Sequence, residues 1–366
     1  MKKSQTFDKI IVVVSDLELG DGSSTDDFTE DYLLVKVIDF YAKSKFPVDL
    51  IRNGDVEDFL KMGIKGIHPK LITPEISVQK LKNAAKAHPT VFESYQEFIK
   101  KKRKRIISII GNHDQDYVFP EVQKTFTKLI HGNKENTLFP GFSYTLPDLK
   151  IIHGNSFDPL HAIPYPAIIE HKKKKYLNLP YLSKAAIDLI HYKKKFPLAE
   201  RIQPLEDILV FNHPIIQRLK VEARKVFLRN ILFEPLRFIG HPLYKLQYAI
   251  FKEGFSRLKQ TKVNVNYAKR AHEYAKKTQV KNLVIGHAHQ PTVIKKEGIN
   301  VYVTGTFRTE YEKTRRLGVF KPKHKYYLEI KIKDEKPVHF EMKHIKSRLP
   351  NLTYKELLHH VEKVKL

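Results

Sequence analysis

The sequence predicts an α/β fold that is interrupted by a basic helical insertion. Short runs of β-branched residues alternate with segments of helical periodicity, which is typical of α/β proteins. Polar and titratable residues directly follow several of the short runs. Between about residues 160 and 280 this alternation stops, and a helical, lysine-rich pattern replaces it. A chain of 366 residues can form one large domain with such an insertion, or two ordinary domains.

The hydrophobic pattern assigns the elements of the core. Short apolar runs bounded by polar residues predict buried strands, and apolar residues at a spacing of three and four predict helices. The predicted strands are 9–15, 48–52, 105–110, 150–152, 281–285, 300–304, 326–332 and 338–345, and the predicted helices are 27–45, 91–102 and 354–364. The expected organisation is a core formed by 1–159 and 281–366, with an insertion at 160–280.

The charge of the chain favours anionic partners. The formal net charge is +26, and residues 160–280 contain 24 Lys and Arg against 9 Asp and Glu. A balance of this sign attracts phosphate-containing substrates, anionic membrane surfaces and nucleic acid. The alternative is a lysine-rich surface that has no anionic partner.

The absence of cysteine excludes disulfides, thiolate nucleophiles and cysteine metal sites, and it fits a reducing compartment. No uncharged apolar run approaches the roughly 18 residues of a membrane-spanning helix, and no secretory signal follows Met1. We therefore expect a cytoplasmic protein that is soluble, or peripheral at the inner face of a membrane.

Potential metal ligands follow five of the predicted strands. The segments are Asp16-Leu17-Glu18, Gly54-Asp55-Val56-Glu57-Asp58, Gly111-Asn112-His113-Asp114, His153-Gly154-Asn155 and Gly286-His287-Ala288-His289. Each one alone is readily explained as a helix cap or a turn. Because sites in open α/β sheets form at the carboxyl ends of strands, five such segments in order predict a metal centre.

These motifs resemble the signature of the calcineurin-like metallophosphoesterases, which reads D-x-H, GD, GNH[DE], H and GHxH. The resemblance runs from Asp16 to His289. It implies a four-layer α/β/β/α sandwich, two divalent metal ions and hydrolysis of phosphoester bonds. Residue by residue, it places Asp16, Glu18, Asp55 and His289 around a first ion, and Asp55, Asn112, His153 and His287 around a second. Asp55 would then bridge the two ions.

The resemblance also implies roles for the neighbouring residues. The ions would polarise the phosphoryl group and activate water. His113 would face the leaving oxygen as a general acid or an electrostatic stabiliser, and Asp114 would hold its imidazole in one tautomer. Glu57 and Asp58 are expected to support the centre rather than to bind metal.

Glu18 departs from the family pattern, which usually has histidine at this position. An added oxygen ligand favours Mn²⁺ or Mg²⁺ over Zn²⁺, with Fe²⁺ as a further alternative, and Mn²⁺ is our leading expectation. The other interpretation is that Glu18 does not reach the metal and that the first site is weak.

The insertion lies between His153 and His287, so it is predicted to form a cap over the site. Tyr244, Tyr248, Phe251 and Phe255 form an aromatic stripe at helical spacing. This stripe either packs on the core or forms a lid that binds an amphiphile at an anionic membrane surface. The chain is here similar to the UDP-2,3-diacylglucosamine hydrolases, although His113 and Glu18 differ from that branch.

The leading hypothesis is therefore a hydrolase of phosphodiester or pyrophosphate bonds in a nucleotide or lipid-linked substrate. The alternatives are a nuclease, a protein phosphatase and an inactive scaffold. The nuclease is less favoured because no recognised nucleic-acid module is evident in the sequence.

Overall fold

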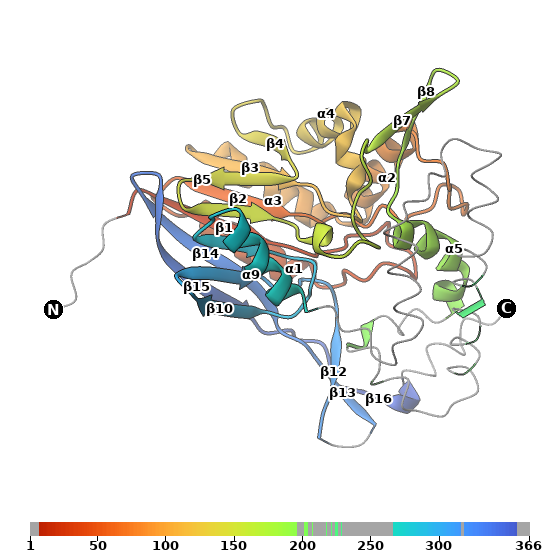
Figure 1. The fold of residues 1–366 in the computed structure, drawn as a ribbon. Helices are drawn as coiled ribbons and strands as arrows, with labels where there is room; N and C mark the ends of the chain where they lie inside the picture. The colour runs from red at the N-terminus through yellow and green to blue at the C-terminus, as the bar shows by residue number, and fades with distance from the viewer. Residues whose placement is uncertain are drawn as a thin grey trace.

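Two β-sheets packed face to face form the centre of the molecule (Figure 1). The computed structural model describes residues 7–195, 201–203, 266–315 and 318–356, together with six single positions between 207 and 228. The first sheet has the order β15 (Lys336–Ile345), β14 (Lys325–Lys333), β1 (Lys9–Val14), β2 (Val48–Asn53), β3 (Lys104–Ile109) and β4 (Thr137–Gly141). The second has the order β10 (Thr292–Lys296), β11 (Ile299–Val303), β9 (Asn282–Ile285), β6 (Leu149–Ile152) and β5 (Ser143–Leu146).

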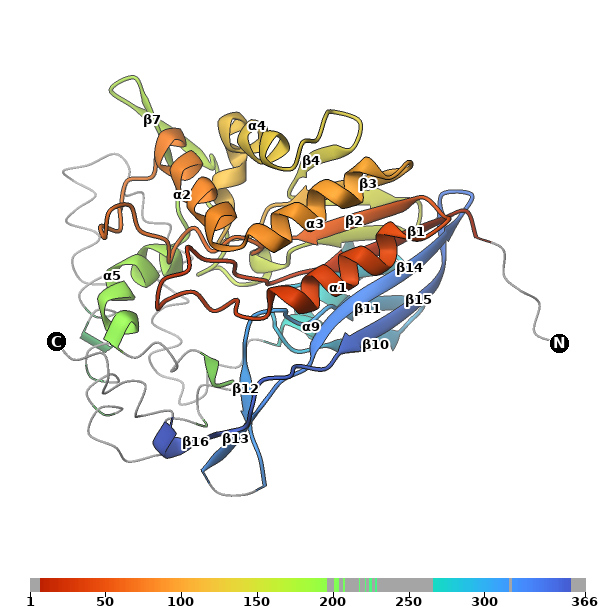
Figure 2. The ribbon, with the colours of Figure 1, turned by 180° about the vertical axis from the view of Figure 1, so that it is seen from behind.

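Alternating side chains of the first sheet bury both of its faces. On β1, Ile11 and Val13 pack between the sheets with Ile151 and Val284 of the second sheet. The intervening side chains of β1 point to the other face, where they join a core with helices α1 (Asp31–Ala42), α2 (Pro74–Ala87), α3 (Pro89–Lys100) and α4 (Pro120–Leu129). Figure 2 shows α1 and α3 lying across this outer face. Because side chains alternate between the two faces of a strand, the first sheet packs against the helices on one face and against the second sheet on the other.

Helix α9 (Tyr267–Lys277) forms the fourth layer. Its Ala271 and Ala275 are fully buried against Leu283 of β9 and Val301 of β11, so it covers the outer face of the second sheet. The predicted α/β/β/α sandwich is thus confirmed. The sequence prediction had included α9 in the insertion, because its lysine-rich surface continues the basic pattern.

The remaining described elements lie around this sandwich. They are a hairpin of β7 (Ile168–His171) and β8 (Lys174–Leu177), helix α5 (Tyr181–Lys195), and a small sheet of β12 (Tyr311–Lys313), β13 (Val319–Pro322) and β16 (Leu352–Thr353). About half of the predicted insertion, including the aromatic stripe, lies outside the described residues, as does most of the predicted helix 354–364.

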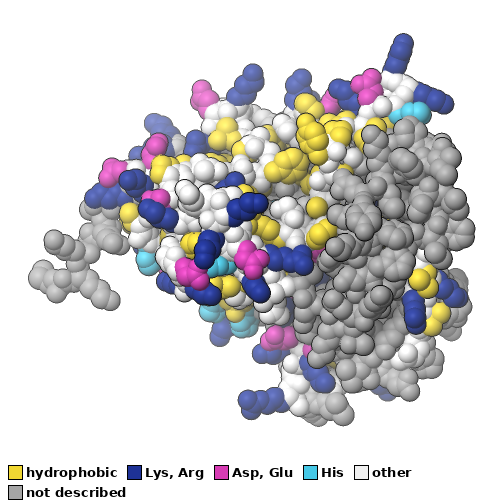
Figure 3. Space-filling model, in the orientation of Figure 1, with side chains coloured by type: hydrophobic (Ala, Val, Ile, Leu, Met, Phe, Trp, Pro, Cys, Tyr) yellow, Lys and Arg dark blue, Asp and Glu magenta, His cyan; other side chains and the backbone are white. Residues whose placement is uncertain are grey.

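The described surface carries both signs of charge. In the view of Figure 3, Lys and Arg side chains are spread over the sandwich with acidic side chains among them. No helix among the described residues is both long enough and apolar enough to span a membrane.

His88 joins three segments on the helical face of the first sheet. It ends α2 and precedes α3, and its ring nitrogens lie 2.9 Å from Asp26 Oδ2 and 3.0 Å from Asp31 Oδ1. Asp26 belongs to the loop after β1, and Asp31 begins α1. Burial acts to lower the pKa of His88, but hydrogen bonds to the two carboxylates raise it to about 9. The charged ring therefore stabilises the fold.

We predict that His88→Gln destabilises the protein in a pH-dependent way. The folded-state pKa lies above the ordinary value of 6.5, so the stabilisation is fully present below pH 6.5 and is lost as the pH rises through about 9. Urea unfolding should show a deficit of about 3 kcal/mol at pH 6 that largely disappears by pH 10. His339→Gln on the exposed side of β15 is the control. A deficit that stays constant from pH 6 to pH 10 would contradict a charged His88.

Candidate metal centre

The carboxyl ends of five strands bring the predicted residues together. β1, β2 and β3 run parallel in the first sheet, and β6 and β9 run parallel in the second. Asp16, Asp55, Asn112 and His153 follow β1, β2, β3 and β6, and all four are at most 2% exposed. Burial of this many polar groups requires that they be paired with each other or with an ion.

The backbone at this edge adopts left-handed conformations at five of the candidate ligands. The non-glycine residues with positive φ at the site are Asp16 (52°), Glu18 (53°), Asp55 (52°), His287 (63°) and His289 (55°). Left-handed conformations are unfavourable for such residues and tend to occur where function requires them. Two glycines permit the close approach, because a Cβ at Gly111 would collide with Asp55 and a Cβ at Gly286 with Ser15.

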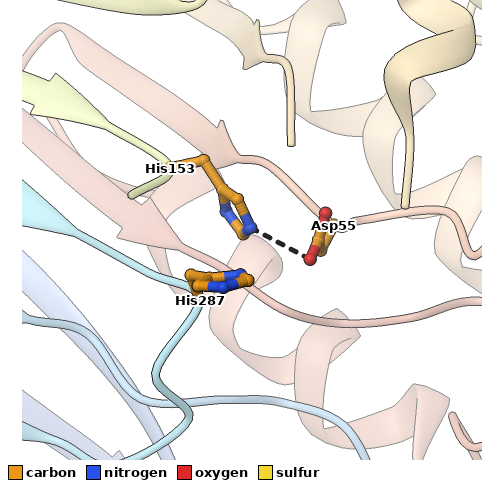
Figure 4. Close-up of side chains that lie close together, drawn as sticks. All are labelled: Asp55, His153 and His287. Atoms are coloured by element: carbon orange, nitrogen blue, oxygen red, sulfur yellow. Dashed lines mark ion pairs between the residues drawn. The ribbon is translucent and has the colours of Figure 1, made fainter. Parts of the chain in front are cut away.

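Asp55, His153 and His287 form a compact group of potential ligands (Figure 4). His153 Nε2 lies 2.9 Å from Asp55 Oδ2, and the rings of His153 and His287 are 5.2 Å apart. One ligand atom from each of the three residues lies within 4.8 Å of the others. The residues that follow β2, β6 and β9 therefore lie close enough to bind the same metal ion.

The protonation of His153 is set by its other nitrogen. Nδ1 lies 2.9 Å from the Asn53 carbonyl oxygen, which can only accept, so Nδ1 carries the hydrogen. Nε2 then faces Asp55 Oδ2 and has no other partner among the described residues, and the buried Oδ1 of Asn112 has no hydrogen-bond partner among them either. These two orphaned atoms fit a bound cation, since nitrogen and amide oxygen are common metal ligands.

The electrostatics of the two histidines differ. Burial acts to lower the pKa of His153, but the Asp55 carboxylate raises it to about 9. Burial, with the nearby His161 and His153, holds the pKa of His287 well below its ordinary value. Without a metal ion, His153 is therefore protonated and its Nε2–H faces Asp55, so that an ion would take the place of this proton. His287 instead offers the neutral imidazole that binds metals.

The residues expected at the first ion lie beside this group. His289 Nε2 is 3.3 Å from Asp16 Oδ1 and 3.8 Å from Glu18 Oε1. The second ring nitrogen of His289 donates to Glu310 Oε1 at 2.7 Å, which leaves Nε2 directed at the two carboxylates. Histidine held by a carboxylate in this way is the usual arrangement around a protein-bound metal.

Glu18 has partners that the sequence did not suggest. Its carboxylate accepts from Lys61 Nζ at 2.5 Å and from Arg308 Nη1 at 3.1 Å. Burial acts to raise the pKa of Glu18, but the two cations hold it well below its ordinary value. Arg308 lies five residues after the end of β11 and outside the five segments of potential ligands, so the sequence did not indicate its place near the centre.

The expected role of Asp114 is wrong. Asp58 Oδ1, not Asp114, lies 2.9 Å from His113 Nδ1 and orients that imidazole. The two oxygens of Asp114 accept instead from the backbone N–H groups of Val56 (2.9 Å) and Gly111 (2.6 Å). Each oxygen of Asp114 is thus occupied by one backbone N–H group, and the side chain stabilises the turns after β2 and β3.

One further histidine lies at the centre. The His161 ring is 4.8 Å from the His287 ring, and its Nδ1 is 2.9 Å from Asp158 Oδ2. Tyr267 at the start of α9 donates to the same carboxylate oxygen at 3.0 Å and packs 5.0 Å from His287. None of these three residues directly follows a predicted strand, so their positions in the sequence did not indicate a role at the centre.

Comparisons with known proteins found no matching family model and no curated relative. The chain is similar to a solved archaeal phosphodiesterase, at 10% identity over 92% of this chain and 99% of that one, with a TM-score of 0.32. It is also similar to the phosphopantetheinyl hydrolase of Mycobacterium tuberculosis (13% identity, 82% and 90% covered, TM-score 0.29). A third similar structure is Vacuolar Protein Sorting 29 of Cryptosporidium parvum (12% identity, 93% and 100% covered, TM-score 0.29). Likenesses this weak do not settle the activity, so its assignment rests on the side chains of the centre.

We predict that Glu310→Gln weakens metal binding, because an amide holds the His289 imidazole less firmly than a carboxylate. Loss of such an outer partner typically lowers metal affinity by about 10- to 100-fold. Competition with a chromogenic chelator would measure the change. Glu312→Gln is the matched control, since the Glu312 carboxylate pairs with the exposed Lys321, whose Nζ lies 2.9 Å away. Equal affinities for the two variants would show that Glu310 does not support a ligand.

Proposed function

We propose that this chain is a metal-dependent phosphoesterase of the calcineurin-like type. The observation that carries the proposal is the pair of orphaned, buried atoms, His153 Nε2 and Asn112 Oδ1, beside the Asp55 carboxylate. An inactive scaffold would have no need to keep these two acceptor atoms buried without a cation to satisfy them, since an unsatisfied buried polar atom destabilises the fold by about 1–3 kcal/mol. Divalent ions in such a centre polarise a phosphoryl group and lower the pKa of bound water.

The ligand set favours Mn²⁺, with Mg²⁺, Fe²⁺ and Zn²⁺ as alternatives. Asp16, Asp55, Asn112 and Glu18 would contribute oxygen, and the three histidines nitrogen. A mixture rich in carboxylate oxygen suits harder cations, whereas imidazole also suits zinc and iron.

His113 is the side chain best placed to act on the substrate. Its side chain is 20% exposed, and Asp58 fixes its Nδ1. Burial acts to lower the pKa of His113, but the carboxylates of Asp58 and Asp55 raise it to about 10. A charged imidazolium can stabilise a phosphoryl oxygen and donate a proton to the leaving oxygen.

The proposed substrate class is a phosphodiester or pyrophosphate in a nucleotide or a lipid-linked molecule. UDP-2,3-diacylglucosamine is the narrower candidate, reached at the cytoplasmic face of an anionic membrane through the basic insertion. The positive charge of the chain supports this preference for anionic substrates. The aromatic stripe that would contact acyl chains lies outside the described residues.

We predict Mn²⁺-dependent hydrolysis of bis(4-nitrophenyl) phosphate. Asp55→Asn and His287→Gln should each lower kcat/KM by about 10³-fold or more, since each removes a proposed ligand. His272→Gln on α9, a buried histidine that contacts the Lys296 carbonyl oxygen, is the control and should keep its activity. The proposed phosphoesterase activity would be rejected if folded, metal-loaded wild-type protein hydrolysed the substrate no faster than Asp55→Asn.

A further inference from the structure

Lys61 places a fixed positive charge next to the first ion position. The side chain is 8% exposed, and Nζ lies 2.5 Å from Glu18 Oε2, 2.9 Å from Asp27 Oδ2 and 2.8 Å from Asp58 Oδ2. Three carboxylates around one ammonium form a cation site that the protein fills with its own side chain. Lys61 follows the Gly54–Asp58 motif by three residues, so the strand end that supplies Asp55 also supplies this cation.

Arg308 supplies a second charge on the same side. Its side chain is 7% exposed, its Nη1 lies 3.1 Å from both oxygens of Glu18, and its Nη2 lies 2.8 Å from Glu310 Oε1. Lys323 pairs with the other oxygen of Glu310 at 2.9 Å, and Arg201 pairs with Asp27 at 3.0 Å. Protein cations thus already neutralise the carboxylates on the Glu18 side of the centre.

The second ion position has no such neighbours. Within the described part of the chain, no lysine or arginine forms an ion pair with Asp55. In the same described part, Asn112 Oδ1 has no hydrogen-bond partner and His153 Nε2 faces only the Asp55 carboxylate. A divalent ion entering here satisfies unpaired atoms, whereas an ion at the first position must approach Lys61 and Arg308.

We infer that the two metal positions are unequal. The position at Asp55, Asn112, His153 and His287 fills first and binds tightly. The position at Asp16, Glu18 and His289 is weaker because Lys61 and Arg308 repel the ion and engage Glu18. This inference rests on the proposed function, since it concerns the same centre.

The size of the effect follows from Coulomb's law. A divalent ion and an ammonium about 5 Å apart repel by several kcal/mol at an effective dielectric constant of about 20, and bound carboxylates offset part of this. Each 1.4 kcal/mol that remains is tenfold in affinity. We therefore expect the two dissociation constants to differ by at least about tenfold.

Calorimetric titration of Mn²⁺ into the metal-free full chain tests the inference without an activity assay. The wild type should show two separable steps. His153→Ala should remove the tight step, and His289→Ala should remove the weak one. Lys61→Met should strengthen the weak step by about tenfold or more and leave the tight step unchanged.

The control is Lys104→Met, which removes another buried lysine at the start of β3, where Nζ donates to the Ser44 and Phe46 carbonyl oxygens. Should Lys61→Met fail to fold by circular dichroism, Arg308→Gln takes its place with the same expected shift. Two steps of equal affinity, loss of the tight step in His289→Ala, or a weak step that neither variant strengthens would overturn the inference and leave the phosphoesterase intact. A wild type that binds no metal would instead overturn the proposed function.

Discussion

The contact between Asp55 and His153 is the constraint on which the centre depends. Because the Asn53 carbonyl fixes the hydrogen of His153 on Nδ1, the Nε2 atom faces a carboxylate oxygen 2.9 Å away with only a proton or a metal ion able to lie between them. Asn53 ends β2, and Asp55 follows it by two residues. A single strand end therefore sets both the tautomer of the histidine and the position of the carboxylate that would bridge two ions.

The rest of the fold holds this strand end in a strained conformation. Left-handed residues such as Asp16, Asp55 and His287 each cost about 1–3 kcal/mol, which the packing of the two sheets and their helices offsets. Beneath the centre, fully buried Arg52 pairs with Glu57 and lies 4.1 Å from the Phe126 ring centroid. This ion pair anchors the turn after β2 from the side opposite the ligands.

The sequence predicts the fold and the location of the centre well, because strand ends carry both signals. The runs at 9–15, 48–52 and 105–110 became β1, β2 and β3 nearly residue for residue, and the polar residues after them converge. The contacts of Glu18 with Lys61 and Arg308, and of Asp58 with His113, could not be predicted. These contacts depend on side-chain packing between segments that are far apart in the chain, and such packing produces no periodic pattern in the sequence. The sequence places α9 in the insertion because its lysine-rich surface continues the basic pattern and its buried residues, Ala271, His272 and Ala275, form no large apolar stripe.

The most direct measurement of the central claim is an anomalous difference map from a crystal soaked in Mn²⁺. The account predicts a strong peak within bonding distance of Asp55 Oδ2, His153 Nε2, Asn112 Oδ1 and a ring nitrogen of His287. An empty map at that point, with His153 still 2.9 Å from Asp55, would mean that a proton alone joins them and would contradict the metal centre.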